Sequence, residues 1–540
     1  MEMRWKLLIV ALFAFLWKGQ AASRVHKDSL LADFDLFVKY LDDTHPDPYT
    51  AFGGRPFFFK TIGHVRGELS KDESLTVEKL ASSLAMLASR LHDGHTYVQL
   101  PAGQSVPNTP VALFQMEAAN DGLMLSKVLA KDKALLGSRV VSVNGYPMDK
   151  IAEFIGMYKP VENRFGVWAM FDRFINMSQW QQWIPGIGTA LKLGLVTTKG
   201  DSVTYSVPNA SVADSRNAVF VSFNENPRLP KGFMEYKTVD RDGKVMMLKF
   251  SAVYSRENFA FMRNNKWDFY GQLYWFYKNV LKCDMPSDTL KAIEGIPSFP
   301  AVFRDMLLEM KAKNVPYLIV DLRGNGGGWT PIVDATVYLL YGDRYFTMKS
   351  FADESFRRVS PLYLKKIKMT MTDFNKRNRT TMKELDYIFE DGEDRTDWSE
   401  EQKYKAIDGL MVDEDTRRQL HEQHGKSLYL PKRVFVVTDV HTFSAAFHYT
   451  FKLWKMGAEV VGVTTSQAPN TYMENTPFYL PHSGISGSIS NYQQIFLPST
   501  DPRARTFTPD LPVDYCHFAK YGFSSDTSIA YILDLLKVRK

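Results

Sequence analysis

Apolar residues follow two different patterns along the second half of this chain. Short, continuously apolar runs, which are typical of buried strands, lie at 244–250, 317–321, 433–439 and 459–463. Among these runs, apolar positions recur at helical spacing over 301–313, 330–341 and 444–456. Strands that alternate with helices in this way favour α/β layers built on parallel strands.

The first half of the chain has a different pattern. Helical spacing predicts amphipathic helices over 29–42 and 74–91, within an N-terminal helical region at 22–104. Residues 105–240 instead alternate apolar and polar positions in short runs, and Asn144-Gly145 is a strong hairpin signal. We therefore expect a separate β-rich module between the helical region and the α/β part.

The α/β part is placed at 241–540, and a charged segment interrupts it. Residues 351–430 are densely charged, and their pattern is largely helical. We expect this segment to be an inserted helical lid or cap, or equally a solvated insertion with no role.

The N-terminus has the residue order that is typical of a secretory signal. Arg4 and Lys6 precede an apolar run at 7–17, which is too short to span a bilayer, and Gly19 and Ala21 follow. We expect residues 1–21 to be removed after Ala21 and the protein to be exported. An uncleaved membrane anchor is the alternative. No later stretch is long and apolar enough to predict a membrane span.

Charge and spacing argue against several classes of partner. The 540 residues carry 66 Lys and Arg against 60 Asp and Glu, a formal charge of +6, without the basic stripe that nucleic-acid binding requires. No spacing of Cys and His residues suits a metal site, so neither a metal nor another cofactor is implied. Whether the two cysteines, Cys283 and Cys516, form a pair stays open.

One of the apolar runs ends in a turn that is rich in glycine. The segment Asp321-Leu-Arg-Gly-Asn-Gly-Gly-Gly328 has four glycines within five positions. Glycines at a strand end allow positive φ and let backbone N–H groups converge on an anion. The spacing fits neither a phosphate loop nor a dinucleotide-binding turn. An oxyanion site or a purely structural turn therefore remains.

Ser444 lies between the apolar run 433–439 and the helix that follows it. A serine in this position often does no more than cap the helix. Alternatively it is a nucleophile, because a helix N-terminus stabilises an alkoxide and an oxyanion. In that case the N–H of Ala445 and a glycine N–H of the other turn would hold the oxyanion.

Three motifs, in this order, carry a family resemblance: Asp93-Gly-His-Thr96, Asp321-Leu-Arg-Gly-Asn-Gly-Gly-Gly328 and Thr442-Phe-Ser-Ala-Ala446. Together they resemble the tail-specific (C-terminal-processing) and tricorn-core serine peptidases. The resemblance implies a crotonase-like (ClpP/crotonase) α/β core and a PDZ-like character for the β-rich module. It also implies Ser444 as the nucleophile, with the backbone of Gly327 and Ala445 as oxyanion donors.

The resemblance leaves the general base to be decided. One branch of the family uses a lysine that follows the serine, but no lysine occurs here between Lys455 and Lys520. The other branch resembles a Ser–His arrangement, which points to His95. Its neutral imidazole can take the serine proton, and its imidazolium can protonate the leaving group. The weaker rivals are His441, His92 and His45.

A third group is expected to orient the histidine. Glu474 follows the predicted strand 459–463, where the catalytic cleft of the family is completed. Asp510 belongs to a Pro-Asp pattern that recurs near the C-terminus of the family. The tricorn branch uses an acid before this pattern, and residues 503–506 contain none. The sequence therefore does not identify the third group.

The leading interpretation is a serine endopeptidase that cleaves a peptide or protein substrate through an acyl-enzyme on Ser444. A catalytically silent relative that binds peptides or apolar ligands is the first alternative. An esterase that uses the same groups is the second. The oligomeric state stays open.

Overall fold

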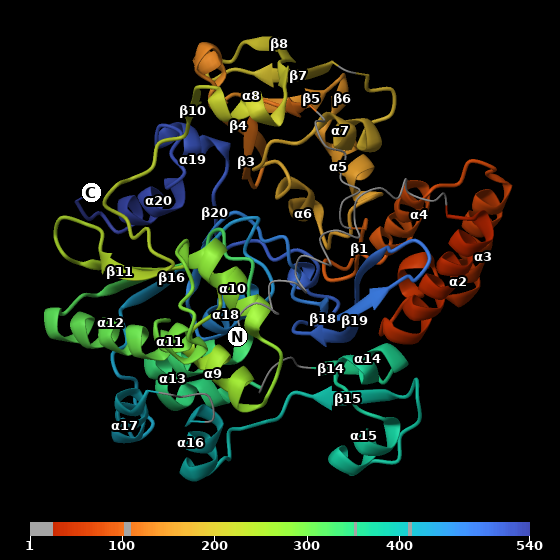
Figure 1. Ribbon diagram of the computed structural model, residues 1–540. Helices are drawn as coiled ribbons and strands as arrows, with labels where there is room; N and C mark the ends of the chain where they lie inside the picture. The colour runs from red at the N-terminus through yellow and green to blue at the C-terminus, as the bar shows by residue number, and fades with distance from the viewer. Residues whose placement is uncertain (1–24, 102–109, 189, 350–353, 409–412, 540) are drawn as a thin grey trace, which may run out of the picture.

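The computed structural model describes residues 25–101, 110–188, 190–349, 354–408 and 413–539. The predicted signal at 1–21 lies outside this part of the chain. Three large sheets and the helices around them make a mixed α/β protein (Figure 1). Within the described ranges, no helix is both long and apolar enough to cross a membrane.

A six-stranded sheet forms the centre of the C-terminal half, and its order is β11-β12-β13-β16-β17-β20. Every neighbouring pair is parallel except β11 with β12. The strands are β11 (Met234–Thr238), β12 (Val245–Phe250), β13 (Tyr317–Asp321), β16 (Arg433–Thr438), β17 (Glu459–Gly462) and β20 (Leu511–Pro512). The parallel α/β arrangement predicted from the apolar runs is therefore present.

Helices cover both faces of this sheet, which explains why its strands are continuously apolar. Met246 and Leu248 point to one face, where they pack with α12 (Phe299–Lys313), α13 (Asp334–Tyr341) and α18 (Ala445–Lys455). Val245 and Met247 point to the other face, toward α19 (Tyr515–Lys520) and α20 (Thr527–Leu535). Successive side chains of a strand alternate between faces, so both sets are buried. Further helices lie beside β12: α9 (Arg256–Asn264), α10 (Tyr270–Phe276) and α11 (Thr289–Glu294).

The predicted β-rich segment folds into a seven-stranded sheet of order β10-β4-β5-β7-β8, with β3 on β4 and β6 on β5. Asn144 and Gly145 both have positive φ, as a tight hairpin turn between β5 and β6 requires. The strands are β3 (Gln115–Ala119), β4 (Gly122–Leu129), β5 (Arg139–Val143), β6 (Tyr146–Pro147), β7 (Leu191–Val196), β8 (Ser202–Val207) and β10 (Phe220–Ser222). Three helices pack on it: α5 (Met148–Gly156), α6 (Arg164–Trp168) and α7 (Met177–Trp183).

The N-terminal helices are α2 (Lys27–Thr44), α3 (Arg55–Lys71) and α4 (Val77–Ser89). Their apolar faces pack together and against side chains of β18 and β19, including Phe478 and Ile489. The chain then leaves α4 and adds the short strand β1 (Tyr97–Gln99) to β19. The segment between α4 and β1 is therefore fixed at the edge of a sheet that belongs to the other end of the chain (Figure 1).

The expectation of a helical insertion at 351–430 is wrong in one respect. Two strands of this segment, β14 (Glu354–Arg358) and β15 (Tyr387–Asp391), join β19 (Ser486–Ile495) and β18 (Thr471–Tyr479) in a five-stranded sheet. Strand β14 lies between β19 and β15 and pairs with both, so its conformation depends on a partner that is distant in the sequence. The remainder is helical, with α14 (Pro361–Lys366), α15 (Met371–Asn378), α16 (Glu400–Asp408) and α17 (Glu414–Glu422).

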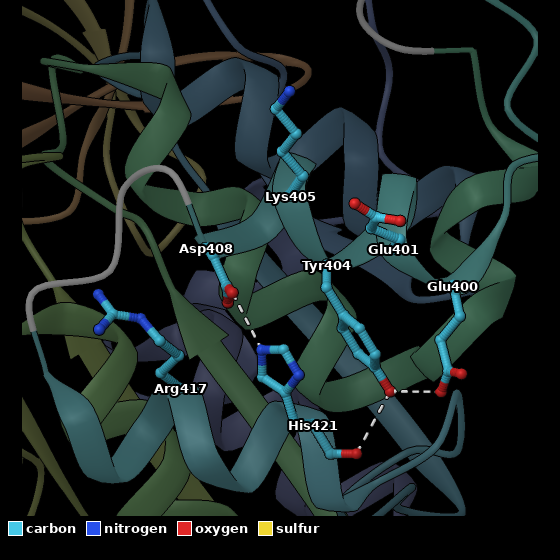
Figure 2. A pocket seen from close by; sticks show the side chains of 7 residues that line it. All are labelled: Glu400, Glu401, Tyr404, Lys405, Asp408, Arg417 and His421. Atoms are coloured by element: carbon cyan, nitrogen blue, oxygen red, sulfur yellow. Dashed lines mark hydrogen bonds and ion pairs between the residues drawn. The ribbon is translucent and has the colours of Figure 1, made fainter.

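The helices α16 and α17 enclose an open hollow of about 720 Å³ (Figure 2). Within it the His421 ring lies 2.9 Å from Asp408 and stacks on Tyr404. None of the site residues predicted from the sequence lines this hollow. It belongs to the charged segment, away from the chemistry-bearing motifs.

Candidate active site

Ser444 is the residue immediately before α18, and its backbone is strained. Strand β16 ends at Thr438, and a short loop carries the chain to Ser444, where φ is +54° and ψ is −126°. Such values are costly for a residue with a side chain and occur mainly at functional sites. Among the described residues, the Ser444 side chain makes no capping hydrogen bond to the helix. The simple cap interpretation is therefore not supported.

The glycine turn lies directly against Ser444. A Cβ atom built on Gly327 would lie 2.6 Å from the Ser444 Cβ and 2.8 Å from the Ala445 nitrogen. Gly327 also has a φ of +102°, which favours glycine. The turn is tied to the serine loop because the Phe443 N–H donates to the Asn325 carbonyl over 3.1 Å. Glycine is therefore required here by both conformation and space.

The two backbone N–H groups expected to hold the oxyanion differ in whether they already donate a hydrogen bond. The Gly327 N–H donates to the Asn325 side-chain oxygen over 2.9 Å. The Ala445 N–H, in the first turn of α18, has no acceptor among the described residues. Gly327 can thus serve as a donor only after Asn325 releases its N–H, and no sequence motif indicates this bond.

His95 lies on the loop between α4 and β1, and its ring stacks on that of Phe443 with centroids 4.8 Å apart. The N-terminal histidine is thereby held against the residue that precedes Ser444. Burial lowers the pKa of His95 below that of an ordinary histidine, although Asp93, the Tyr472 carbonyl and Glu474 oppose this shift. A buried imidazole of lowered pKa is neutral at physiological pH.

Asp93 organises the loop that carries His95. Its carboxylate accepts from the His95 N–H over 2.8 Å, accepts from the Thr96 hydroxyl, and lies 3.4 Å from the His45 Nε2. Burial raises the pKa of Asp93, but the hydrogen bonds and charge of these neighbours outweigh burial and hold the pKa at about 2. The adjacent Gly94 leaves room for Phe443, since a Cβ there would lie 2.7 Å from that ring.

The rival histidines have other partners. His441 lies 3.2 Å from Asp172, and although burial lowers its pKa, Asp172, Asp439 and Glu117 raise it to about 9. It is therefore protonated at neutral pH and unsuited to accept a proton. His92 is an exposed residue whose pKa is lowered, mainly by partial desolvation of its ring.

Of the two candidate orienting acids, only Glu474 acts on His95. It lies in β18 with a φ of +69°, forms an ion pair with Lys366 over 2.9 Å, and raises the His95 pKa by its charge. Asp510 instead accepts a hydrogen bond from the Val460 N–H over 2.9 Å and so holds the start of β17.

Two side chains that no sequence motif marks also contact the site. The Gln467 side-chain oxygen accepts from the Ser444 N–H, and Gln467 is fully buried. Glu162 accepts from the Ala468 N–H and from the Thr471 hydroxyl, each over 2.8 Å, and faces Gly94. Burial raises the Glu162 pKa to about 8, so this carboxyl is protonated at neutral pH. Neither residue has a local sequence signal, because each acts across the fold.

A third such residue is His448, one helical turn after Ser444. Its Nδ1 lies 2.8 Å from the Thr330 hydroxyl, and burial lowers its pKa to about 3. In the described ranges, no group of three or more His, Cys, Asp or Glu side chains is arranged to hold a metal ion. The arrangement offers a hydroxyl, a neutral imidazole and a helix N-terminus, which suits acyl transfer.

Comparison with known proteins gives a family for this arrangement. The model of peptidase family S41 matches residues 292–510, while no curated protein sequence matches the chain. The crystal structure of mature CPAF has a TM-score of 0.56 at 14% identity and covers 95% of this chain and 96% of its own. Mature CPAF complexed with lactacystin has a TM-score of 0.55 at 14% identity, covering 95% and 98%.

At this identity the likeness to CPAF shows a shared fold. The family match includes both the glycine turn and the loop of Ser444. The segment 292–510, which carries the glycine turn and Ser444, matches peptidase family S41, and together with this fold it supports a serine peptidase similar to the tail-specific proteases.

Proposed function

We propose that this peptidase hydrolyses peptide bonds through an acyl-enzyme on Ser444, with His95 as the general base. The observation that carries the proposal is the backbone of Ser444, which is strained, at a helix N-terminus, and against a glycine turn. The stacking of His95 on Phe443 supports the choice of base. The paired Ser–His chemistry needs no cofactor.

In the first step, His95 takes the proton as the Ser444 oxygen attacks the substrate carbonyl. The resulting imidazolium then protonates the leaving amine, and water releases the acyl group by the same route in reverse. The lowered pKa of His95 keeps the imidazole neutral before attack. Nearby Asp93 and Glu474 favour the imidazolium once it forms, and Glu474 is the proposed orienting acid.

The Ala445 N–H is the proposed first oxyanion donor, because it is unengaged and the helix N-terminus favours negative charge. The second donor comes from the glycine turn. We propose that Gly327 exchanges its hydrogen bond with Asn325 for one with the oxyanion. Asp510 has no role in this scheme.

The proposal also includes the type of core, the type of β-rich module and the export of the protein. The parallel sheet with helices on both faces supports a crotonase-like core, and the antiparallel sheet with α5 supports a PDZ-like module. The basic, apolar and small-residue order of residues 1–21 supports export. The substrate is a peptide or protein.

The test is the Ser444→Ala variant assayed with an unstructured protein substrate and a serine-reactive phosphonate. We expect hydrolysis and labelling to disappear while the thermal unfolding midpoint stays close to wild type, because the side chain makes no capping bond. The control is Ser206→Ala, at an exposed position of β8, which should leave hydrolysis, labelling and the unfolding midpoint unchanged. Hydrolysis retained by Ser444→Ala would overturn the proposal.

The esterase alternative is tested by comparing ester and peptide turnover in wild type and in a variant without His95. Peptide hydrolysis demands protonation of a poor leaving group, so only a peptidase should lose peptide turnover more steeply than ester turnover when His95 is removed. If the wild-type protein neither reacts with the phosphonate nor hydrolyses any peptide or ester, it is a catalytically silent relative.

A further inference from the structure

A cavity of about 740 Å³ lies between the C-terminal end of α9 and the pair α14–α15. Figure 1 shows these elements on neighbouring parts of the same side of the molecule. Part of the wall is apolar and aromatic, supplied by Phe261, Trp267, Tyr363, Ile367, Met369 and Phe374. The rest of the lining is polar or charged, so the cavity combines apolar surface with groups that could fix a ligand's orientation.

Both walls of this cavity are connected to the proposed catalytic groups. On one side, the Phe261 ring lies 5.0 Å from that of Trp329, which directly follows Gly328 in the glycine turn. On the other side, Lys366 forms the ion pair with Glu474, whose charge raises the His95 pKa. Each wall is therefore one side-chain contact away from Trp329, beside the glycine turn, or from Glu474.

The charged side chains that line the cavity are mostly positive. Four of them are Lys266, Lys366, Lys368 and Arg377, and one, Asp268, is negative. Lys366 is neutralised by Glu474. The other three cations have no ion-pair partner among the described residues, so the cavity keeps an excess of unpaired positive charge next to an apolar wall.

We propose that this cavity is a substrate subsite that selects an acidic side chain beside an aromatic or aliphatic one. The inference rests on the proposed function and names the substrate class for the same site. The three unpaired cations are exposed and lie on one cavity, so that their combined charge attracts a carboxylate. The neighbouring Trp267, which is 52% exposed, offers apolar contact to the adjacent residue of the substrate.

The experiment measures kcat/KM for three peptides that are identical except for one position near the cleaved bond, occupied by Asp, Asn or Lys. Each peptide also carries a Phe beside that position. The test variant is the double charge reversal Lys368→Glu with Arg377→Glu. The matched control is Lys365→Glu with Lys376→Glu, each close in the chain to one of the test residues but outside the cavity lining.

We expect wild type to prefer Asp over Asn by roughly 3- to 30-fold, as one or two favourable surface charge contacts produce. The test variant should lose this preference or favour Lys, and the control variant should keep it. Raising the salt concentration should reduce the wild-type preference because it screens exposed charges. Equal preferences in the test and control variants would overturn the subsite.

Binding to the Ser444→Ala protein separates this inference from the proposed function. Fluorescence anisotropy of labelled Asp and Lys peptides should show the same charge preference and its loss in the Lys368→Glu, Arg377→Glu background. Charge-selective binding without Ser444-dependent hydrolysis in the parent would support the cavity but overturn the peptidase mechanism. Ser444-dependent hydrolysis that is indifferent to the substrate charge would overturn the cavity alone.

Discussion

The two halves of the candidate site are built by different means. The half that carries Ser444 is shaped by backbone: a strand end, a helix start, a residue at positive φ and a glycine turn packed against it. The half that carries His95 is shaped by side chains, among which Asp93 and Glu162 are buried and hydrogen-bonded. The first half joins two segments that each carry a sequence motif, the glycine turn and the Ser444 loop, whereas the second joins four distant segments.

Because of this difference, different kinds of substitution should disrupt the two halves. A backbone-defined site fails when a Cβ or a changed φ disturbs the turn. A site defined by buried side chains fails when a hydrogen-bond partner is removed, because the remaining polar group stays unsatisfied. The ring contact between His95 and Phe443 is where the two halves meet.

The largest effect should follow from removing the base itself. His95→Ala should lower kcat/KM by roughly 10²- to 10⁴-fold, the usual contribution of general acid–base catalysis, with little change in the free energy of unfolding. The measurement is steady-state hydrolysis beside thermal denaturation. The control is His421→Ala on α17, which pairs with Asp408 far from the motifs. Similar losses in the two variants would contradict the assignment.

The backbone half is tested by paired glycine variants. Gly327→Ala should lower kcat/KM by roughly 10²- to 10³-fold, as loss of an oxyanion donor does, because its Cβ would collide with Ser444. Gly326→Ala is the control, since a Cβ there has nothing within 4 Å. The measurements are kcat/KM and the rate of phosphonate labelling for both variants. A Gly326 variant as impaired as the Gly327 variant would show that the close approach is not the cause.

The side-chain half is tested at Glu162. Glu162→Ala leaves the buried Ala468 N–H without its acceptor and should destabilise the protein by about 1–3 kcal/mol, with an accompanying loss of activity. Glu162→Gln should match the wild-type free energy of unfolding at about pH 4, where the carboxyl is protonated and resembles the amide. Chemical denaturation of the three proteins measures the difference.

The same carboxyl predicts a pH dependence of stability. Because the folded-state pKa of about 8 is above the ordinary value, its stabilising contribution is complete below about pH 4.3 and is lost as pH rises to 8. Glu162→Gln lacks this loss. The free energy of unfolding of Glu162→Gln, relative to that of wild type, should therefore increase as the pH rises from about 4.3 to 8. A difference between the two proteins that does not change with pH would contradict a raised Glu162 pKa.

The smallest expected effect is a shift of the pH–rate profile. Because His95 acts when neutral and its pKa is lowered, the acidic limb of kcat/KM should lie below about pH 6.5. Glu474→Gln removes a charge that raises this pKa and should move the limb to still lower pH. Glu401→Gln on α16 is the matched control, and an unmoved limb in the Glu474 variant would exclude its coupling to His95.

Much of the fold was predictable because its signals are local. The buried strands β12, β13, β16 and β17 coincide with the continuous apolar runs, and Asn144-Gly145 marked its hairpin. The strands β14 and β15 were missed, since a charged strand is defined by its pairing, here of β14 with β19 and of β15 with β14, rather than by its own composition. Gln467 and Glu162 were missed for the same reason.

The sequence by itself determined the parallel α/β core, the glycine turn, the position of Ser444 and the absence of a lysine base. These depend on apolar periodicity and on residues adjacent in the chain. Only the tertiary structure decided that His95 stacks on Phe443, that Gly327 gives its N–H to Asn325, and that Glu474 rather than Asp510 acts on the histidine. Such contacts depend on burial and on distances across the fold, and no local pattern encodes them.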